Sequence, residues 1–131
     1  MGRETIARTD YYTFEVDTDI NRLFLTLFGF WENAGVAPDI FTDIENALDK
    51  LTPGFTNLVD MTRFKIPPND VKELFEKVQH RIIARGIAKN AEVISSAFVE
   101  VNLEEVASQS ELSKVLRQFK GMAEALEWLN E

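Results

Sequence analysis

Residues 22–31 read RLFLTLFGFW, and from the second position onward they form the most apolar run in the chain. Continuous apolar runs of this length are typical of strands buried on both faces of a sheet. Residues 12–16 alternate between apolar and polar side chains, which indicates a half-buried strand. The link between the two, residues 17–21, is rich in Asp, Thr and Asn, which favour turns. We therefore predict an antiparallel hairpin over residues 12–31.

Beyond the hairpin, apolar residues recur at helical spacing in several segments that alternate with short apolar runs. Strands that alternate with amphipathic helices need crossover connections, which favour parallel pairing. The sequence thus predicts an α/β domain with a mixed, mostly parallel sheet of about four to five strands, an N-terminal antiparallel hairpin and about four helices. Helices are expected over residues 38–51, 67–85, 106–119 and 122–129, and further strands over residues 55–61 and 92–101.

Two segments, the N-terminus and residues 119–121, have a less clear pattern. Residues 1–10 are polar and mixed in charge, and we expect a loose or edge-lying start there. Residues 119–121 interrupt the last two helices, either as a break or as a very short strand. With neither a linker nor an internal repeat in the sequence, residues 1–131 are predicted to form a single domain.

Composition excludes several classes of function. The chain has 14 Lys and Arg against 22 Asp and Glu, a formal net charge of −8, which argues against a nucleic-acid partner. It has no cysteine, which excludes disulfides and a cysteine nucleophile and suits a reducing cytoplasm. No apolar run approaches the roughly 20 residues that span a bilayer, and the N-terminus has no apolar core of a secretory signal. We therefore expect a cytoplasmic protein without a transmembrane segment.

Motifs for common chemistry are missing from the sequence. The six glycines are scattered and form no phosphate-binding loop, so no cofactor is predicted. His80 is the only histidine, which leaves no basis for a metal site of several histidines, and no metal is predicted. An enzyme could use Asp60 together with His80 only if the fold brought them together. The chain is therefore predicted not to be an enzyme.

Asp60 closes the predicted strand 55–61, and ligand crevices of open α/β sheets lie outside the carboxyl ends of strands. Its carboxylate can cap the backbone amides of Thr62 and Arg63, or it can have a raised pKa and a role in a site. The ten phenylalanines and two tryptophans are expected to fill the core. The sharper hypothesis is an apolar pocket rimmed by a set of aromatic residues: Phe28, Phe30, Trp31, Phe64 and Trp128.

Three stretches carry a resemblance to a known family: LTLFG at 25–29, LVDMTRF at 58–64 and MAEALEWL at 122–129. Their order resembles STAS domains, the group typified by bacterial anti-anti-sigma factors. The chain is most similar to the SpoIIAA-like branch, which is also compared with the lipid-binding CRAL-TRIO fold. The resemblance covers residues 12–131. It implies the same mixed α/β fold and a regulatory role without catalysis.

The resemblance also implies site residues. Anti-anti-sigma members carry an Asp-Ser-Ser-Gly-type motif after the third strand, and a kinase phosphorylates its first serine. Asp60 matches the aspartate and Thr62 matches the second serine, whereas Met61 replaces the phosphoacceptor and Arg63 replaces the glycine. Since methionine cannot be phosphorylated, the phospho-switch serine is absent, and Thr62 is the remaining candidate for phosphorylation.

Two hypotheses on function follow. The first is a non-enzymatic STAS-like regulatory module whose protein partner binds around Asp60, Met61, Thr62, Arg63, Phe64 and Trp31, its acidic charge favouring a basic patch on the partner. The alternative is a domain that binds a small apolar ligand or lipid. A homodimer is compatible with either hypothesis.

Overall fold

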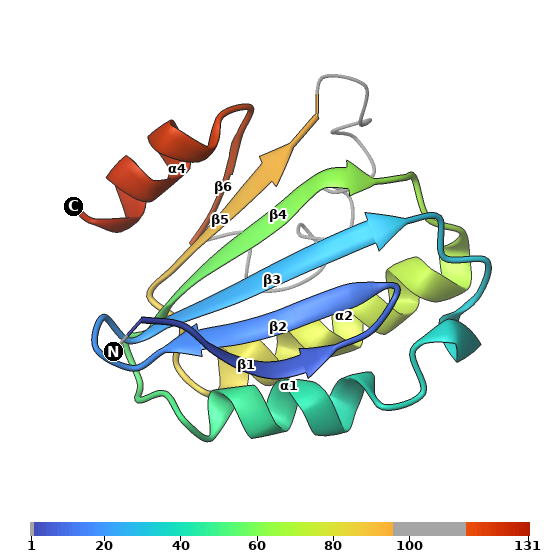
Figure 1. Cartoon of the computed structure of the whole chain (residues 1–131), viewed down its shortest axis with the longest axis horizontal. Coiled ribbons are helices and arrows are strands. Elements are labelled where there is room, and N and C mark those ends of the chain that lie inside the picture. Colours follow the sequence, from blue (N-terminus) through green and yellow to red (C-terminus); the bar gives the residue numbers. More distant parts are fainter. Residues whose placement is uncertain (1, 96–114) are drawn as a thin grey trace.

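A six-stranded sheet is the framework of the described chain (Figure 1). The computed structural model describes residues 2–95 and 115–131. Within these residues the strands lie side by side in the order in which they follow one another along the chain. They are β1 (Glu4–Arg8), β2 (Tyr12–Asp17), β3 (Arg22–Gly29), β4 (Thr56–Phe64), β5 (Lys89–Ile94) and β6 (Leu116–Phe119).

The direction of pairing changes at β3. β1, β2 and β3 pair antiparallel, whereas β3 with β4, β4 with β5 and β5 with β6 pair parallel. Short links join the antiparallel strands. The longer connections after β3 and β4 contain helices and bring the chain back to the end of the sheet at which the preceding strand began. The predicted mixed, mostly parallel sheet with an N-terminal antiparallel hairpin is confirmed.

Two of the six strands lie where the sequence analysis did not place one. Residues 4–8 form the edge strand β1, where Ala7 pairs with Phe14, so this start is edge-lying but not loose. Residues 116–119 form β6, where the prediction had the end of a helix. The spacing of Leu116 and Phe119 suits a helix, but in the fold the backbone pairs with β5, with Val93 opposite Phe119. Residues 106–114 of the helix predicted over 106–119, and residues 96–101 of the predicted strand 92–101, lie outside the described residues.

Helices cover both faces of the sheet. The described helices are η1 (Ala34–Val36, a short 3₁₀ helix), α1 (Ile40–Leu48), α2 (Asn69–Ala84) and α4 (Met122–Leu129). The α1 and α2 helices pack on one face, over a core that includes Tyr12, Phe14 and Ile44. The α4 helix packs on the other face, where it forms a smaller core with β3, β4 and β5: Phe24, Leu58, Ala91, Val93, Ala125 and Leu129.

The period-two alternation of the strands separates these two cores. Leu58 of β4 belongs to the core under α4, whereas its neighbour Val59 belongs to the core under α1 and α2. Because successive side chains of a strand point to opposite faces, a strand buried on both faces must be apolar at nearly every position. This explains why β3 is apolar at most of its positions.

The predicted ends of the elements need adjustment. The hairpin strand predicted to reach residue 31 ends at Gly29, whose φ of +63° suits glycine and turns the chain out of the sheet. The strand predicted over 55–61 runs from Thr56 to Phe64, three residues further, because it continues to pair with β3. The first predicted helix is confirmed but shorter, ending at Leu48.

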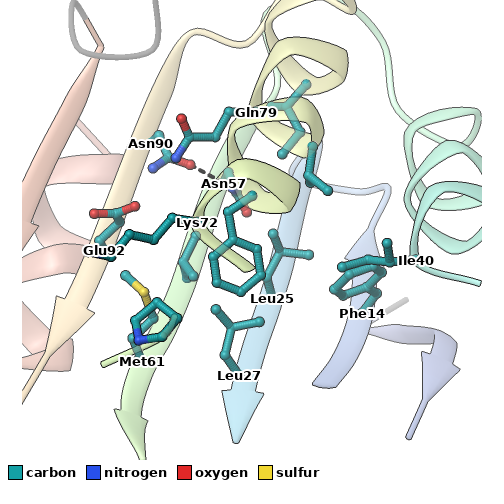
Figure 2. Close-up of a pocket in the computed structure, with 15 residues that line it drawn as sticks. Phe14, Leu25, Leu27, Ile40, Asn57, Met61, Lys72, Gln79, Asn90 and Glu92 are labelled. Atoms are coloured by element: carbon teal, nitrogen blue, oxygen red, sulfur yellow. Dashed lines mark hydrogen bonds between the residues drawn. The ribbon is translucent and has the colours of Figure 1, made fainter. Parts of the chain in front are cut away.

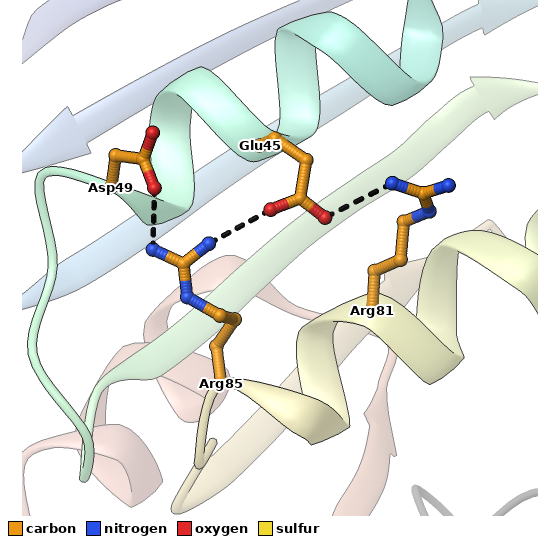
Figure 3. A network of polar contacts seen from close by, with 4 residues as sticks. All are labelled: Glu45, Asp49, Arg81 and Arg85. Atoms are coloured by element: carbon orange, nitrogen blue, oxygen red, sulfur yellow. Dashed lines mark hydrogen bonds and ion pairs between the residues drawn. The ribbon is translucent and has the colours of Figure 1, made fainter.

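A polar network joins α1 to α2 on the outer surface (Figure 3). Arg85 donates to Glu45 Oε1 at 2.8 Å and to Asp49 Oδ1 at 2.7 Å, and Arg81 donates to Glu45 Oε2 at 3.2 Å. All four side chains are at least one-third exposed. Exposed ion pairs contribute about 0–1 kcal/mol each to the free energy of unfolding. The network therefore adds little stability, and its main effect is on the relative position of the two helices.

Candidate functional site

The end of β4 that follows Asp60 carries a bulge against β3. Thr26 pairs with Asp60, but Phe28 pairs with Arg63, so two steps along β3 (26 to 28) match three along β4 (60 to 63). The extra residue breaks the alternation of the strand, and two consecutive residues, Thr62 and Arg63, are both exposed. Bulges bend a strand and redirect its side chains, and they are enriched beside functional sites.

Asp60 lies inside β4 and not at its end, and its carboxylate is held by the bulge. Its Oδ1 accepts hydrogen bonds from the backbone N–H of Thr62 at 3.0 Å and from the Thr62 hydroxyl at 2.7 Å. The expected cap on the Thr62 amide is therefore present. It holds the Thr62 hydroxyl at the surface, pointed back toward a carboxylate.

Two exposed apolar side chains accompany the bulge. Phe30, just after β3, is 47% exposed, and Ile66, just after β4, is 41% exposed. The backbone N–H of Lys65 donates to the Gly29 carbonyl at 3.0 Å, which ties the two segments together at the same end of the sheet. We name this end of the sheet the bulge surface, defined by Asp60, Thr62 and Arg63 together with Phe30 and Ile66.

Three of the predicted contact residues lie in the core. Met61 is 2% exposed, Phe64 is 3% exposed and Trp31 is fully buried. The Trp31 indole N–H donates to the Phe28 carbonyl at 3.0 Å, and its ring meets the Phe64 ring edge-on, with centroids 5.9 Å apart. Of the residues predicted to bind a partner, the structure therefore brings only Asp60, Thr62 and Arg63 to the surface.

The predicted pocket with five aromatic residues at its rim is not formed. Trp31 and Phe64 fill the core under α1 and α2, whereas Trp128 packs against Phe119 beside the core under α4. The two tryptophans thus lie on opposite faces of the sheet. The prediction was wrong because aromatic content shows how much apolar surface is buried but not on which face.

A cavity lies elsewhere, between the sheet and α2, and has a volume of about 60 Å³ (Figure 2). Most of its wall is apolar, with residues such as Leu25, Val59, Phe75 and Ile82. Its lining also includes a set of polar side chains: Asn57, Lys72, Gln79, Asn90 and Glu92. An apolar wall with a few convergent polar groups is the usual composition of a small-molecule site.

Asn57 of β4 and Asn90 of β5 form a buried pair in this wall. Each is 1% exposed, and the Asn57 amide donates to Asn90 Oδ1 at 2.5 Å. The second polar atoms of the pair, Asn57 Oδ1 and Asn90 Nδ2, are buried and have no hydrogen-bond partner among residues 2–95 and 115–131. Buried polar atoms are almost always hydrogen-bonded, so one unpaired acceptor and one unpaired donor in the same side-chain pair are a departure from the usual pattern.

Glu92 brings a carboxyl group into the same cavity. Its side chain is 5% exposed, and Gln118 of β6 donates to its Oε1 at 3.2 Å. Burial raises the pKa of Glu92 to about 7, although the hydrogen bond from Gln118 acts in the opposite direction. Removal from water disfavours the charged form of a carboxyl group, so Glu92 changes protonation near neutral pH.

The sequence reasoning did not single out these polar residues, although a signal was present. Asn57, Val59 and Met61 are two residues apart, so they point to the same face of β4. When a polar residue lies on a strand face whose other residues are apolar, the polar side chain is expected to be buried with them. Asn90 and Glu92 are two residues apart and precede Ile94, so the three share one face of β5.

Other candidate chemistry is not supported by the described contacts. His80 is exposed, and its Nε2 lies 4.0 Å from Glu76 of the same helix, whereas Asp60 contacts Thr62. Among residues 2–95 and 115–131, no group of three or more His, Cys, Asp or Glu is placed to hold a metal ion. None of the helices in this part of the chain has the length and apolar character that crossing a membrane requires.

Comparison with solved structures identifies the class of this fold as the STAS fold of anti-sigma-factor antagonists. One match is the Bacillus cell fate determinant SpoIIAA in its phosphorylated form, with a TM-score of 0.54 and 15% identity over 90% of this chain and 98% of that chain. Another is the anti-sigma factor antagonist SpoIIAA in its unphosphorylated form, with a TM-score of 0.56 and 16% identity over 91% and 96% of the two chains. No family model and no curated protein matches the sequence. The expected fold is thus confirmed.

Proposed function

We propose that this chain is a non-enzymatic regulatory module of the cytoplasm that binds a protein partner through the bulge surface. The observation that carries the proposal is the bulge itself, which exposes Thr62 and Arg63 side by side next to two exposed apolar residues. Aromatic and arginine side chains dominate the binding energy of protein interfaces. The structural neighbour SpoIIAA is an antagonist of an anti-sigma factor, which is itself a protein.

The charge of the chain indicates the character of the partner. A net charge of −8 attracts a partner surface with an excess of Lys and Arg and speeds its approach at low salt. At the bulge surface itself, Phe30 and Ile66 supply apolar contact area and Arg63 supplies a hydrogen-bonding anchor. We therefore expect a partner with an apolar contact region, an acceptor for Arg63 and a basic rim.

Thr62 is part of this proposal as a candidate for phosphorylation. The SpoIIAA structures include a phosphorylated form. Here the Thr62 hydroxyl donates to Asp60. A phosphate on this oxygen would remove the hydrogen bond and place a charge of about −2 beside a carboxylate. Modification of Thr62 would therefore disrupt the bulge surface and weaken binding of the partner.

The alternative, a domain for a small apolar ligand or lipid, is less well supported. The cavity of about 60 Å³ is far smaller than the roughly 300–1,000 Å³ of pockets for drug-sized ligands. Its wall also contains buried amides and a carboxyl group, which an apolar ligand would leave unpaired.

The proposal is tested by site-specific photo-crosslinking in native cells, with the photoreactive residue at Phe30. We expect a discrete protein adduct that Arg63→Glu weakens at least tenfold. The matched control is Lys77→Glu, the same charge change at an exposed position of α2. Equal adduct yields for Arg63→Glu and Lys77→Glu would refute a specific role of the bulge surface. The same conclusion would follow if a photoreactive residue placed at position 77 gave as much adduct as one placed at position 30. An adduct of twice the mass of the chain would identify a homodimer instead.

A further inference from the structure

We propose that Phe24 and Glu15 form a docking site for an arginine side chain of the partner, and that Arg3 of this chain occupies the site in the free protein. This step rests on the proposed function of the bulge surface and adds a second contact to it. The contacts of Arg3 with Phe24 and Glu15, at the border of the sheet area that α4 covers, carry the inference.

The α4 helix covers only part of its face of the sheet. It packs against β4, β5 and β6, and Figure 1 shows it on that side of the molecule, away from β1 and β2. Thr13 and Glu15 of β2 point to the same face as α4, because they alternate with residues of the core under α1 and α2. The same alternation places Thr26 and Phe28 of β3 there. We name these four partly exposed residues the open face.

Phe24 lies at the border between the open face and the core under α4. It is only 5% exposed, and the guanidinium carbon of Arg3 lies 3.8 Å from the centroid of its ring. The strand register places Glu15 opposite Phe24, and Glu15 Oε1 lies 3.5 Å from Arg3 Nη1. An aromatic ring beside a carboxylate binds a guanidinium group through a cation–π contact and an ion pair. The site therefore favours arginine over an acidic or an uncharged side chain.

Arg3 can be displaced from this site at little cost. It precedes β1, whose pairing with β2 begins at Glu4, and half of its side chain is exposed. Exposed ion pairs of this kind contribute little to the stability of a fold. A partner's arginine would form the same two contacts that Arg3 gives up. The exchange is therefore nearly neutral, and the rest of the interface supplies the net affinity.

The open face is continuous with the bulge surface. Phe28 of the open face pairs with Arg63 of the bulge surface across β3 and β4. Phe24 is four residues before Phe28, which is roughly 13 Å along a strand. A partner that contacts Arg63 thus reaches Phe24 with a residue of its rim. Because Glu15 remains there as a carboxylate when Arg3 leaves, the complementary rim residue is a cation.

The probe for this site is N-acetyl-L-argininamide, and its matched control is N-acetyl-L-citrullinamide, which has the same shape without the charge. We would titrate each into the natural chain and into Arg3→Ala at constant ionic strength and follow the ring signals of Phe24 by NMR. The arginine probe should bind Arg3→Ala at least threefold more tightly than the natural chain, because the tethered Arg3 no longer competes. The citrulline probe should bind Arg3→Ala at least threefold more weakly than the arginine probe.

Two further variants make the test specific. Arg8→Ala removes another exposed arginine, from within β1, and should bind the arginine probe as the natural chain does. Adding Glu15→Gln to Arg3→Ala should weaken binding of the arginine probe at least threefold. In the crosslinking experiment, Arg3→Ala should raise the adduct yield from position 30 at least twofold, whereas Arg8→Ala should leave it unchanged.

Equal binding of the arginine probe to Arg3→Ala and to the natural chain would overturn the proposal. So would equal binding of the two probes, or an adduct yield that Arg3→Ala leaves unchanged. The titration needs no protein partner, so its outcome is separate from that of the crosslinking experiment. A chain that binds the arginine probe as expected but forms no adduct would refute the proposed function and still establish the arginine site.

Discussion

Glu92 is a carboxyl group in the interior of a strand, and its protonation links the fold to pH. In the unfolded chain a glutamate has a pKa near 4.5, whereas burial raises the pKa of Glu92 to about 7. Between these values the unfolded chain has released the proton and the folded chain still holds it. The free energy of unfolding therefore falls as the pH rises from about 4.5 to about 7.

We predict that Glu92→Gln removes this dependence. The neutral amide keeps the size of the side chain and can still bond with Gln118, and it never ionises. A pKa difference of this size corresponds to roughly 3 kcal/mol, so the variant should be more stable than the natural chain by up to that amount at pH 8 and about equally stable at pH 4.5. Urea unfolding at both pH values measures this difference.

The control for this prediction is Glu73→Gln, which makes the same change at an exposed position of α2. It should leave the pH profile unchanged within about 0.5 kcal/mol. If Glu92→Gln and the natural chain lose stability in parallel between pH 4.5 and 8, the pKa of Glu92 is not raised in the fold.

Two elements, α1 and α2, depend on each other through both their apolar faces and their outer charges. Each helix buries an apolar stripe, including Ile44 of α1 and Val78 of α2, against the same face of the sheet. The network around Arg85 lies outside that core (Figure 3). Burial of these apolar stripes therefore provides most of the stability of the helix pair. The ion pairs add little to it, because water screens charges that are partly exposed.

We predict that Arg85→Ala lowers the free energy of unfolding by about 0.5–1 kcal/mol at low salt, and by less in 0.5 M NaCl. The variant loses contacts to both Glu45 and Asp49. Lys77→Ala, at an exposed position of the same helix, is the control and should change the stability by less. A loss for Arg85→Ala that is unaffected by salt would assign its role to packing of the side-chain stem instead.

The β4 strand shows how one element can serve both the core and a surface. Up to Met61 its side chains alternate between the two cores, and beyond Asp60 the bulge sends two of them outward together. A regular strand would have buried one of Thr62 and Arg63. The bulge is thus the local feature on which the proposed partner surface depends.

At the scale of the whole molecule, the described residues form two cores that lie on opposite faces of the sheet. The larger core lies under α1 and α2 and contains Ile44, whereas the smaller lies under α4 and contains Leu129. Side chains on opposite faces share few contacts, although the strands between them belong to both layers. Residues in the two cores should therefore affect stability independently while the chain unfolds as one cooperative unit.

We predict that Ile44→Val and Leu129→Ala are additive. The first should reduce the free energy of unfolding by about 0.5–1.5 kcal/mol and the second by about 2–4 kcal/mol, with the double variant within about 0.5 kcal/mol of the sum. Urea unfolding followed by both fluorescence and circular dichroism measures the three values. Ile40→Val, combined with Ile44→Val, is the control for coupling, because both residues belong to one core.

Two separate unfolding transitions for the Leu129→Ala variant would contradict this expectation. They would mean that α4 and its core open without the rest of the sheet.

Much of the fold was predictable because its signals are local. The alternation over residues 12–16, the apolar run after residue 22 and the helical spacing of α1 each follow from the period of one element. The capping of Thr62 by Asp60 was predictable for the same reason, since both partners lie within three residues. Of the six residues predicted to bind a partner, three lie at the bulge and three lie in the core, and their role in binding stays a prediction.

Sequence by itself determined the class of this protein: apolar runs that alternate with amphipathic helices can bury their faces only as a layered α/β domain. Tertiary structure alone decided that residues 116–119 form a strand, that β4 bulges beside β3, and that Asn57 and Asn90 meet in a cavity. Each of these depends on contacts between segments far apart in the chain. A local period records which residues are buried, but pairing, register and the distribution between the two faces arise only when the whole sheet assembles.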